Sequence, residues 1–224
     1  STSNWTVYHV GASSGNLFLN LTDAVSAGGN LIVSVGTSSF GVTGGGVNAN
    51  GGTYIAYLFA HNAGGFGLTG TDNVISCGSW TGNGSTSGPT ITLGYEPQWL
   101  LWKKTSNATN SNWVMVDNMR GFLATGGSPT SPQLRPNLSN AEQNASFVQL
   151  TSTGFTTDTG VDAESYIYIA IRRGPMKTPT SGTSVFSPLT RTGTNNTATI
   201  TSISFPPDFL LGLGRSGGMG GTST

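Results

Sequence analysis

Three carboxylates lie close together in the sequence, at Asp158, Asp162 and Glu164, with Gly160 among them. Carboxylates around a turn are typical Ca²⁺ ligands, and a carboxylate pair is also what a glycosidase needs. The corresponding stretch earlier in the chain, residues 46–51, contains Gly and Asn in place of these acids. We therefore interpret residues 158–164 as a solvated hairpin turn and expect no metal, no cofactor and no catalytic residue.

Other patterns that could do chemistry lack their required context. The stretch "GFGLTG" at 65–70 has the glycine spacing of a dinucleotide fingerprint, but the following "TDNVISCGSW" predicts a strand, not the helix that holds a pyrophosphate. His9 and His61 have no Cys or carboxylate cluster at ligand spacing, and no Gly-x-Ser-x-Gly elbow occurs. We expect that the protein is not an enzyme.

A candidate ligand-binding position is the turn "SWTGNGSTSG" at 79–88, which aligns with "TRTGTNN" at 190–196. The alignment sets Trp80 against Arg191, and these two residues cannot fill the same core position. We therefore expect Trp80 at the surface, beside Asn83, where its ring stacks on a sugar or anchors an interface. Trp80, Asn83 and Arg191 form the predicted ligand-binding set. The alternative is that Trp80 closes the end of its own β-sandwich.

The composition of the chain predicts an all-β fold. Its 224 residues include 34 Gly and only 8% charged residues, with abundant Ser, Thr and Asn, a mixture that disfavours helices. Nine Lys plus Arg balance nine Asp plus Glu, so no basic field favours nucleic acid. No apolar run is long enough for membrane insertion. Cys77 is the single cysteine and cannot form an intrachain disulfide.

The sequence repeats itself once. Tyr54 in "GGTYIAYLFA" recurs as Tyr166 in "AESYIYIAIR", 112 residues later (166 minus 54). "SNWTVYH" at 3–9 is matched by "SNWVMVD" at 111–117, and "TITLGYEPQWLLWKK" from Thr90 by "TITSISFPPDFLLGLGR" from Thr199. We predict two tandem copies of about 110 residues with one shared fold, at 1–108 and 109–224. An alternative phase places the borders near Gly64 and Pro179.

Strands are expected within each copy where β-branched and aromatic residues cluster between Gly-rich turns. Tyr54–Phe59 and Tyr166–Ile171 are apolar on both faces, which predicts central strands. Further strands are expected at Leu31–Val35, Trp99–Trp102, Trp113–Val116, Phe147–Leu150 and Phe209–Leu213. Many short strands at this spacing favour a β-sandwich of jelly-roll or lectin-like topology for each repeat.

Several of these motifs, taken in order, resemble a repeat domain of phage tail-fibre and virion appendage proteins of the marine-phage type. They are "VFSPLTRTGT", "FPPDFLL" and its partner "YEPQWLLWKK", "DNMRG" at 117–121, "TSTGFTTDTG" at 151–160 and "YIYIAIRR". The first copy has "YHVGAS" where the second has Asp117 to Gly121. That departure suits a fold-supporting Asp–Arg ion pair better than a catalytic pair.

The resemblance implies a non-enzymatic structural protein on the exterior of a virion, in a tail fibre or appendage. Its expected partners are sister copies in a homo-oligomer, with a trimer favoured, other virion proteins and a host-surface glycan or protein. The alternative function is purely architectural, as a capsid-decoration or tail protein that binds only sister subunits. The closing "GLGRSGGMGGTST" reads as a linker, so we expect a segment of a longer protein.

Overall fold

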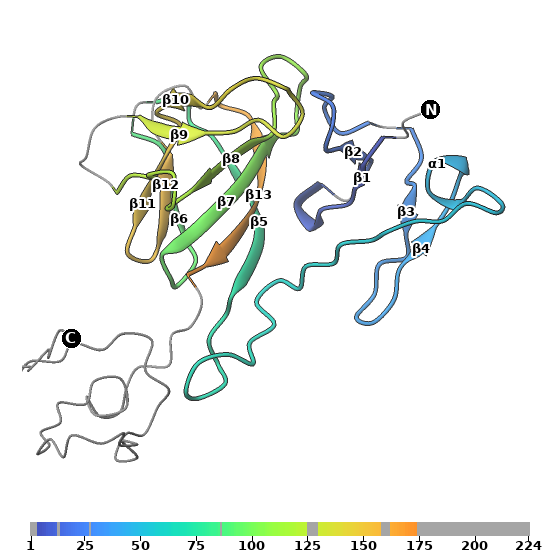
Figure 1. Cartoon of the computed structure of the whole chain (residues 1–224), viewed down its shortest axis with the longest axis horizontal. Coiled ribbons are helices and arrows are strands. Elements are labelled where there is room, and N and C mark those ends of the chain that lie inside the picture. Colours follow the sequence, from blue (N-terminus) through green and yellow to red (C-terminus); the bar gives the residue numbers. More distant parts are fainter. Residues whose placement is uncertain are drawn as a thin grey trace, which may run out of the picture. The chain divides into compact units, whose positions relative to one another are not determined.

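A computed structural model describes residues 4–12, 14–26, 28–85, 87–124, 130–157 and 162–173. The chain divides into two units, residues 1–176 and 177–224, and the second unit lies outside the described residues. Antiparallel strands make up nearly all the secondary structure (Figure 1), so the all-β prediction is confirmed. The described helices are the short η1 (Val10–Ala12) and α1 (Gly45–Asn48). None of the described helices could span a membrane.

A four-stranded antiparallel sheet forms the main layer, in the order β5-β13-β7-β8. Its strands are β5 (Ile75–Thr81), β13 (Ser165–Arg172), β7 (Pro97–Lys104) and β8 (Val114–Asp117). As the sequence predicts, β13 is central and apolar on both faces. Because side chains alternate along a strand, Tyr166 and Tyr168 face one side while Ile167 faces the other.

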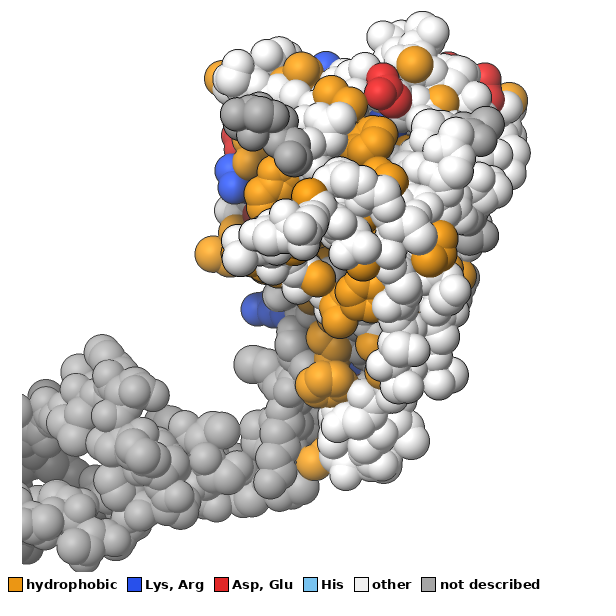
Figure 2. Space-filling model, turned by 90° about the vertical axis from the view of Figure 1, so that its right-hand side faces the viewer, with side chains coloured by type: hydrophobic (Ala, Val, Ile, Leu, Met, Phe, Trp, Pro, Cys, Tyr) orange, Lys and Arg blue, Asp and Glu red, His pale blue; other side chains and the backbone are white. Residues whose placement is uncertain are grey.

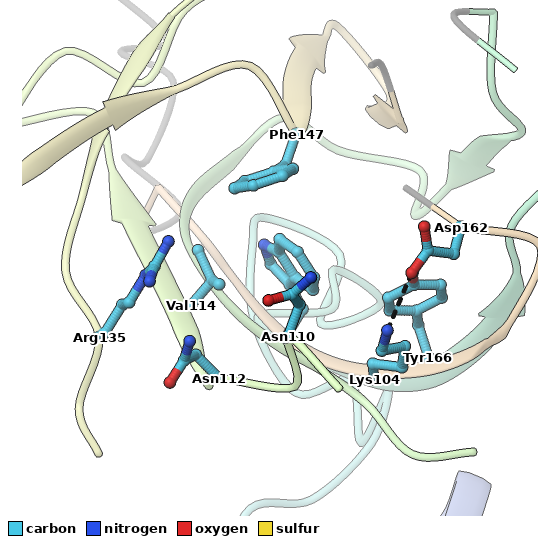
Figure 3. A pocket seen from close by; sticks show the side chains of 9 residues that line it. Lys104, Asn110, Asn112, Val114, Arg135, Phe147, Asp162 and Tyr166 are labelled. Carbon is cyan, nitrogen blue, oxygen red and sulfur yellow. Dashed lines mark hydrogen bonds and ion pairs between the residues drawn. The ribbon is translucent and has the colours of Figure 1, made fainter. Parts of the chain in front are cut away.

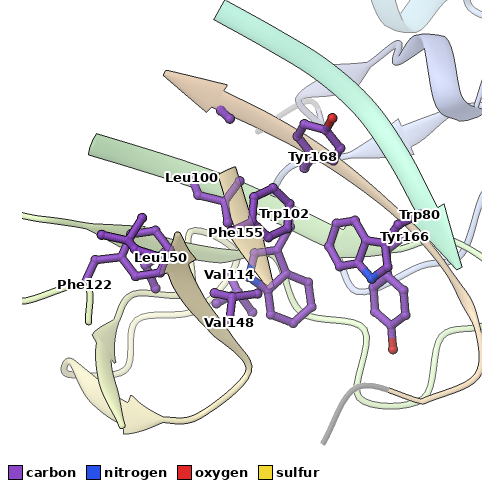
Figure 4. Packing of buried hydrophobic residues seen from close by; sticks show 12 residues of the cluster. Trp80, Leu100, Trp102, Val114, Phe122, Val148, Leu150, Phe155, Tyr166 and Tyr168 are labelled. Atoms are coloured by element: carbon purple, nitrogen blue, oxygen red, sulfur yellow. The ribbon is translucent and has the colours of Figure 1, made fainter. Parts of the chain in front are cut away.

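A second, three-stranded sheet packs against one face of the first. It consists of β11 (Val148–Thr151), β12 (Gly154–Thr157) and β6 (Thr90–Thr92), in that order. The shared core, seen in Figure 4, contains Trp80, Leu100, Trp102, Val114, Val116, Phe122, Val148, Leu150, Phe155, Tyr166, Tyr168 and Ala170. Burial of each large apolar side chain contributes about 2 to 3 kcal/mol, so this core is the main stabilising element. We call β5 to β13 the two-sheet unit.

The expected border between the copies meets this unit in its middle. Residue 108 lies in the loop between β7 and β8, and these two strands pair with each other from Trp99↔Asp117 to Trp102↔Val114. Strand β5, before the border, pairs along its whole length with β13, after it. A cut at residue 108 would therefore divide the four-stranded sheet between the two predicted copies. The alternative borders near Gly64 and Pro179 fall outside it.

The N-terminal residues cover the outer face of the four-stranded sheet. Strands β1 (Thr6–Val7) and β2 (Leu17–Phe18) pair in a hairpin. Leu17 packs with Ile167 and Trp113, and the Trp113 indole N–H donates to the carbonyl of Phe18 at 2.8 Å. These contacts bury the apolar outer face of β13, which explains how a strand apolar on both faces is accommodated.

Lys103 is buried on this outer face of the sheet. Lys103 is fully buried, and its ammonium donates to the carbonyl of Ser111 at 2.5 Å and to the Ser111 hydroxyl at 3.1 Å. The ammonium lies 5.6 Å from the centre of the Trp113 ring. Desolvation lowers the pKa of Lys103 to about 8, and the charge of Asp23 acts in the opposite direction. Lys104, the next residue, points to the inner face.

His9 attaches the N-terminal layer to the sheet. Its Nδ1 accepts a hydrogen bond from the Gly11 N–H at 3.0 Å, so Nε2 carries the proton and donates to the Tyr168 carbonyl at 2.9 Å. Burial lowers the pKa of His9 below 6.5, the Tyr168 bond raises it, and the charge of His61 lowers it further. Protonation of Nδ1 would remove the lone pair that accepts from the Gly11 N–H, so this hydrogen bond would be lost.

We expect the N-terminal layer to loosen in mild acid. Because the folded pKa of His9 is lowered, the detached state binds the proton first. The contribution of His9 to docking is fully present above about pH 6.5 and is lost as the pH falls through the lowered folded pKa. Hydrogen–deuterium exchange of residues 5–26 should be severalfold faster at pH 5 than at pH 7.5, after correction for intrinsic rates. A His9→Gln variant should show no such acceleration, and an equal acceleration in it would contradict this role.

The remaining strands are short. They are β3 (Ile32–Val33), β4 (Gly41–Val42), β9 (Ser131–Gln133) and β10 (Gln143–Ala145), paired as β3 with β4 and β9 with β10. The prediction of a strand at Tyr54–Phe59 is wrong for the described structure, in which this segment forms no strand and is exposed. The strand expected at Phe209–Leu213 lies outside the described residues.

Candidate functional site

The predicted exposure of Trp80 is wrong. Its side chain is 8% exposed and stacks on Tyr166, with ring centres 4.9 Å apart and planes 10° from parallel. Its ring also meets Phe155 edge-on, at 5.7 Å between centres. Trp80 therefore lies inside the core (Figure 4), where no sugar ring can reach its face. The alternative, that Trp80 closes the end of its own β-sandwich, requires a buried Trp80, and burial is what the structure shows.

The other two members of the predicted ligand-binding set are Asn83 and Arg191. Asn83 is exposed, and its side chain is engaged within its own loop: Oδ1 accepts from the Ser85 N–H at 3.0 Å and Nδ2 donates to the Ser87 carbonyl at 3.0 Å. Arg191 lies outside the described residues. Asn83 thus serves a local turn, which is a common role of Asn.

The described acids of the 158–164 cluster bind separate partners. Asp162 pairs with Lys104 at 2.9 Å, while Glu164 accepts from Ser106 and Asn107 at 2.5 and 2.6 Å. Asp158 lies outside the described residues. Within the described ranges no group of three or more His, Cys, Asp or Glu is arranged to hold a metal. Each described acid of the cluster has a structural partner of its own.

Two other sequence motifs form local structure. In "GFGLTG", the Gly65 N–H donates to the Gly70 carbonyl at 2.9 Å, and the strand expected after the motif is confirmed as β5. The expected ion pair in "DNMRG" is also present. Asp117 accepts from the Arg120 backbone N–H at 2.9 Å and from its Nε at 2.8 Å, which closes the turn after β8.

A hollow of about 270 Å³ opens at one end of the two-sheet unit (Figure 3). Its lining comes from β7, β8, β13, the loops before β8 and β13, and the segment from 135 to 147, and consists of Trp102, Lys104, Asn110, Asn112, Val114, Arg135, Phe147, Asp162 and Tyr166. The volume is slightly below the range of about 300 to 1,000 Å³ usual for ligand sites. It suits one small ring or side group.

The hollow combines aromatic surface with opposed polar groups. Figure 3 shows Arg135 and Asn112 on one side and the Lys104–Asp162 pair on the other, with Phe147 above them. Trp102 meets Phe147 and Tyr166 edge-on, at 5.6 and 5.8 Å between ring centres. Burial raises the pKa of Tyr166 to about 12, and the charge of Asp162 acts in the same direction, so its hydroxyl stays protonated at neutral pH.

Two buried N–H groups of this lining have no hydrogen-bond partner among the described residues. They are Nε1 of Trp102 and Nε of Arg135. A buried donor without a partner costs about 1 to 3 kcal/mol, which a bound acceptor would recover. Asp162 neutralises Lys104, whereas Arg135 has no ion pair within the described ranges. Among the described residues, the charge of Arg135 in this lining therefore has no compensating carboxylate.

Glu164 holds the loop that forms one rim of the hollow. Its two carboxylate oxygens accept from Ser106 and Asn107, and the Asn107 side chain accepts from the Thr109 N–H at 3.0 Å. Within this loop, Asn110 has a φ of 51°, in the left-handed region that Asn tolerates. The loop spans residues 105–112, "TSNATNSN", and contains the border predicted between residues 108 and 109.

Comparison with known proteins identifies one family. Residues 1–175 match the family model described as "Domain of unknown function (DUF7483)". No curated protein and no solved structure matches the chain. The match covers the N-terminal layer, the two-sheet unit and the hollow, and with them well over half of the sequence. The chain therefore belongs to the DUF7483 family.

Proposed function

We propose that this chain is a non-enzymatic virion structural protein, a segment of a phage tail fibre or appendage, whose hollow binds an acidic sugar of the host surface. The single observation that carries the glycan part is the lining of the hollow. It joins aromatic rings with amide groups, and it adds two buried donors and an Arg135 charge that have no partner within the described part of the chain. Aromatic faces next to hydrogen-bonding groups suit a sugar ring.

The acidic character of the ligand follows from charge. Arg135 presents a guanidinium, which favours carboxylate or sulfate oxygens over hydroxyl groups. The whole chain is neutral, with nine basic and nine acidic residues, so a general attraction to polyanions does not contribute. A sugar bearing one carboxylate, such as a uronic acid, meets both requirements.

The wider setting rests on the sequence resemblance to virion appendage repeats. In this proposal the two-sheet unit is one β-sandwich of a tandem array, of jelly-roll or lectin-like type, and the chain lies on the exterior of the particle. Its partners are sister copies, with a trimer favoured, and other virion proteins. Antibodies raised against the two-sheet unit should decorate intact particles in electron micrographs, and absence of decoration on particles shown to contain the chain would contradict an exterior position.

We expect Arg135→Ala to weaken binding of an oligo-uronate by about tenfold to a hundredfold, because a charge-assisted hydrogen bond contributes about 1.5 to 3 kcal/mol. Titration calorimetry with the full chain measures the effect. Arg173→Ala, which removes an equal charge from an exposed position outside the hollow, is the matched control and should bind as the unmodified chain does. Asp162→Asn should strengthen binding, since it leaves Lys104 unpaired. Equal affinity for neutral gluco-oligosaccharides would contradict the acidic ligand.

The architectural alternative is favoured by a different observation. Residues 54–59 expose a run of large apolar side chains, including Ile55 at 79% and Leu58 at 75%. Exposed apolar runs of this kind mark protein–protein contacts. If the chain binds only sister subunits, Arg135→Ala leaves host adsorption unchanged while changes in residues 54–59 abolish assembly.

A further inference from the structure

An exposed run of apolar side chains lies at residues 54–59, here called the apolar strip. Tyr54, Ile55, Tyr57, Leu58 and Phe59 are between 48% and 79% exposed. The strip forms no strand and pairs with no strand among the described residues. Figure 2 shows one face of the molecule, where hydrophobic side chains reach the surface among mostly uncharged polar ones. Water exposure of such a run is unfavourable, so the strip needs a cover.

The internal repeat identifies what the strip corresponds to. Residues 54–59 match residues 166–171, at a separation of 112 (166 minus 54). Residues 166–171 form the centre of β13, which is paired on one edge with β5 and on the other with β7. The same type of sequence is therefore buried where both neighbouring strands are present and exposed where the described structure provides neither.

The sequence counterparts of those two neighbours lie near the C-terminus. Residues 185–192, "VFSPLTRT", match residues 74–81 at a separation of 111 (192 minus 81), and so correspond to β5. Residues 207–214, "PDFLLGLG", match residues 97–104 at a separation of 110, and so correspond to β7. The chain thus contains sequence counterparts of β5 and β7 more than a hundred residues after the strip.

Residues that face each other across β13 and β5 differ in a paired way between the two internal repeats. In the two-sheet unit Tyr168 lies opposite Gly78, and a Cβ on Gly78 would lie 2.5 Å from the Tyr168 hydroxyl. The large ring therefore needs glycine as its partner. The counterpart of Tyr168 is Ala56 and that of Gly78 is Leu189, so a large–small pair becomes a small–large pair. This exchange conserves volume, as expected for residues in contact.

Two neighbouring positions support the same register. Tyr166 stacks on Trp80 at 4.9 Å, and their counterparts Tyr54 and Arg191 could make a guanidinium–aromatic stack in the same place. Pro188 corresponds to Cys77, whose N–H points away from β13 and donates to His61 Nδ1 at 3.0 Å. A proline there loses no bond to the strip, as is usual on an edge strand.

We propose that the apolar strip receives residues 185–192 of a second copy of this chain, as the strand that corresponds to β5. In this arrangement residues 185–192 and 207–214 of one chain flank residues 54–59 of the next chain. The strand order then matches that of β5, β13 and β7 in the two-sheet unit. Each copy then offers one strip and one complementary segment, so copies join head to tail. Because the net charge of the chain is zero, two chains do not repel each other through their net charge.

A disulfide test follows from the register. Ile167 lies opposite Ser79, so Ile55 should lie opposite Thr190. The outward N–H at Cys77 makes this the closely spaced kind of pair, with Cα atoms about 4.5 Å apart, which a disulfide can bridge. In a Cys77→Ser background, an Ile55→Cys chain and a Thr190→Cys chain are mixed under mild oxidation. We expect a covalent dimer. Ala56→Cys, whose side chain faces the opposite side, is the matched control and should give none.

The outcomes separate the possible occupants. A chain carrying both Ile55→Cys and Thr190→Cys should form covalent multimers. An intrachain disulfide in a monomer, with no dimer from the mixed single variants, would overturn the second copy as the source. Absence of any specific disulfide would overturn the register itself.

Noncovalent assembly gives an independent measurement on the unmodified chain. Its mass by light scattering should rise with concentration. Ala56→Tyr, which places a ring against Leu189, should abolish that rise, and adding Leu189→Gly should restore it. A concentration-independent monomer, or a failure of the second change to restore assembly, would overturn the proposal.

Discussion

Replacing Trp80 with Ala should lower the free energy of unfolding by about 3 to 5 kcal/mol, the usual cost of deleting a buried Trp ring. Trp80 contacts Tyr166, Phe155, Trp102 and Tyr168, so its removal leaves a cavity between the two sheets. Chemical denaturation of the full chain, followed by circular dichroism, measures the change. An effect of this size is a large fraction of the stability of an ordinary domain.

The matched control for this prediction is Trp5→Ala. Trp5 is 56% exposed, and its one described ring contact is Tyr57, at 6.5 Å between centres. Its removal should change the free energy of unfolding by less than about 1 kcal/mol. Equal effects of Trp80→Ala and Trp5→Ala would mean that Trp80 lies at the surface after all.

Gly78→Leu should strongly lower the free energy of unfolding of the two-sheet unit unless Tyr168 is made smaller at the same time. A Cβ at Gly78 would lie 2.5 Å from the Tyr168 hydroxyl oxygen and 2.7 and 2.8 Å from two ring carbons, inside van der Waals contact, and a Leu side chain adds three further carbons. Overpacking of this kind costs about 1 to 3 kcal/mol and sometimes more. The effect should be near or beyond the upper end of that range, because Tyr168 is itself held by Phe155 and Trp80.

The double variant Gly78→Leu with Tyr168→Ala reproduces the pair found at Leu189 and Ala56. Relative to the sum of the single variants, it should recover about 2 kcal/mol, within the coupling energies seen for residues in contact. Tyr168→Ala alone and Gly78→Ala complete the comparison. Additive effects in the double-mutant cycle would contradict direct contact between the two side chains, and with it the argument from paired changes in the repeat.

Paired changes between the internal repeats also explain why the predicted surface exposure of Trp80 is wrong. Trp80 and Arg191 occupy matched positions, and the inference that the two cannot fill the same core position assumed an unchanged environment. The environment of Trp80 is a stack on Tyr166 and a space beside Phe155. The copies differ at several neighbouring positions at once, such as Tyr168 against Ala56. A mismatch between copies therefore indicates either exposure or a changed partner, and one sequence does not distinguish them.

The sequence by itself determined the local features of this protein. Low charge, abundant Gly and β-branched residues predict the all-β fold, and the two-sided apolar pattern of Tyr166–Ile171 predicts the central strand β13. The strand after "GFGLTG" and the Asp117–Arg120 ion pair are also local, since each depends on residues close together in the chain. Period-two alternation and turn chemistry act within a few residues, so they can be read directly.

Only the tertiary structure decided which strands meet and what lies between them. Tyr54–Phe59 carries the same pattern as the centre of β13 but is exposed, because a strand is buried only where other segments supply its neighbours. The hollow likewise joins Trp102, Arg135, Phe147 and Asp162 from separate parts of the sequence, and its rim is a loop that the sequence suggests as a border. Burial and pocket formation depend on long-range strand pairing, which local periodicity does not encode.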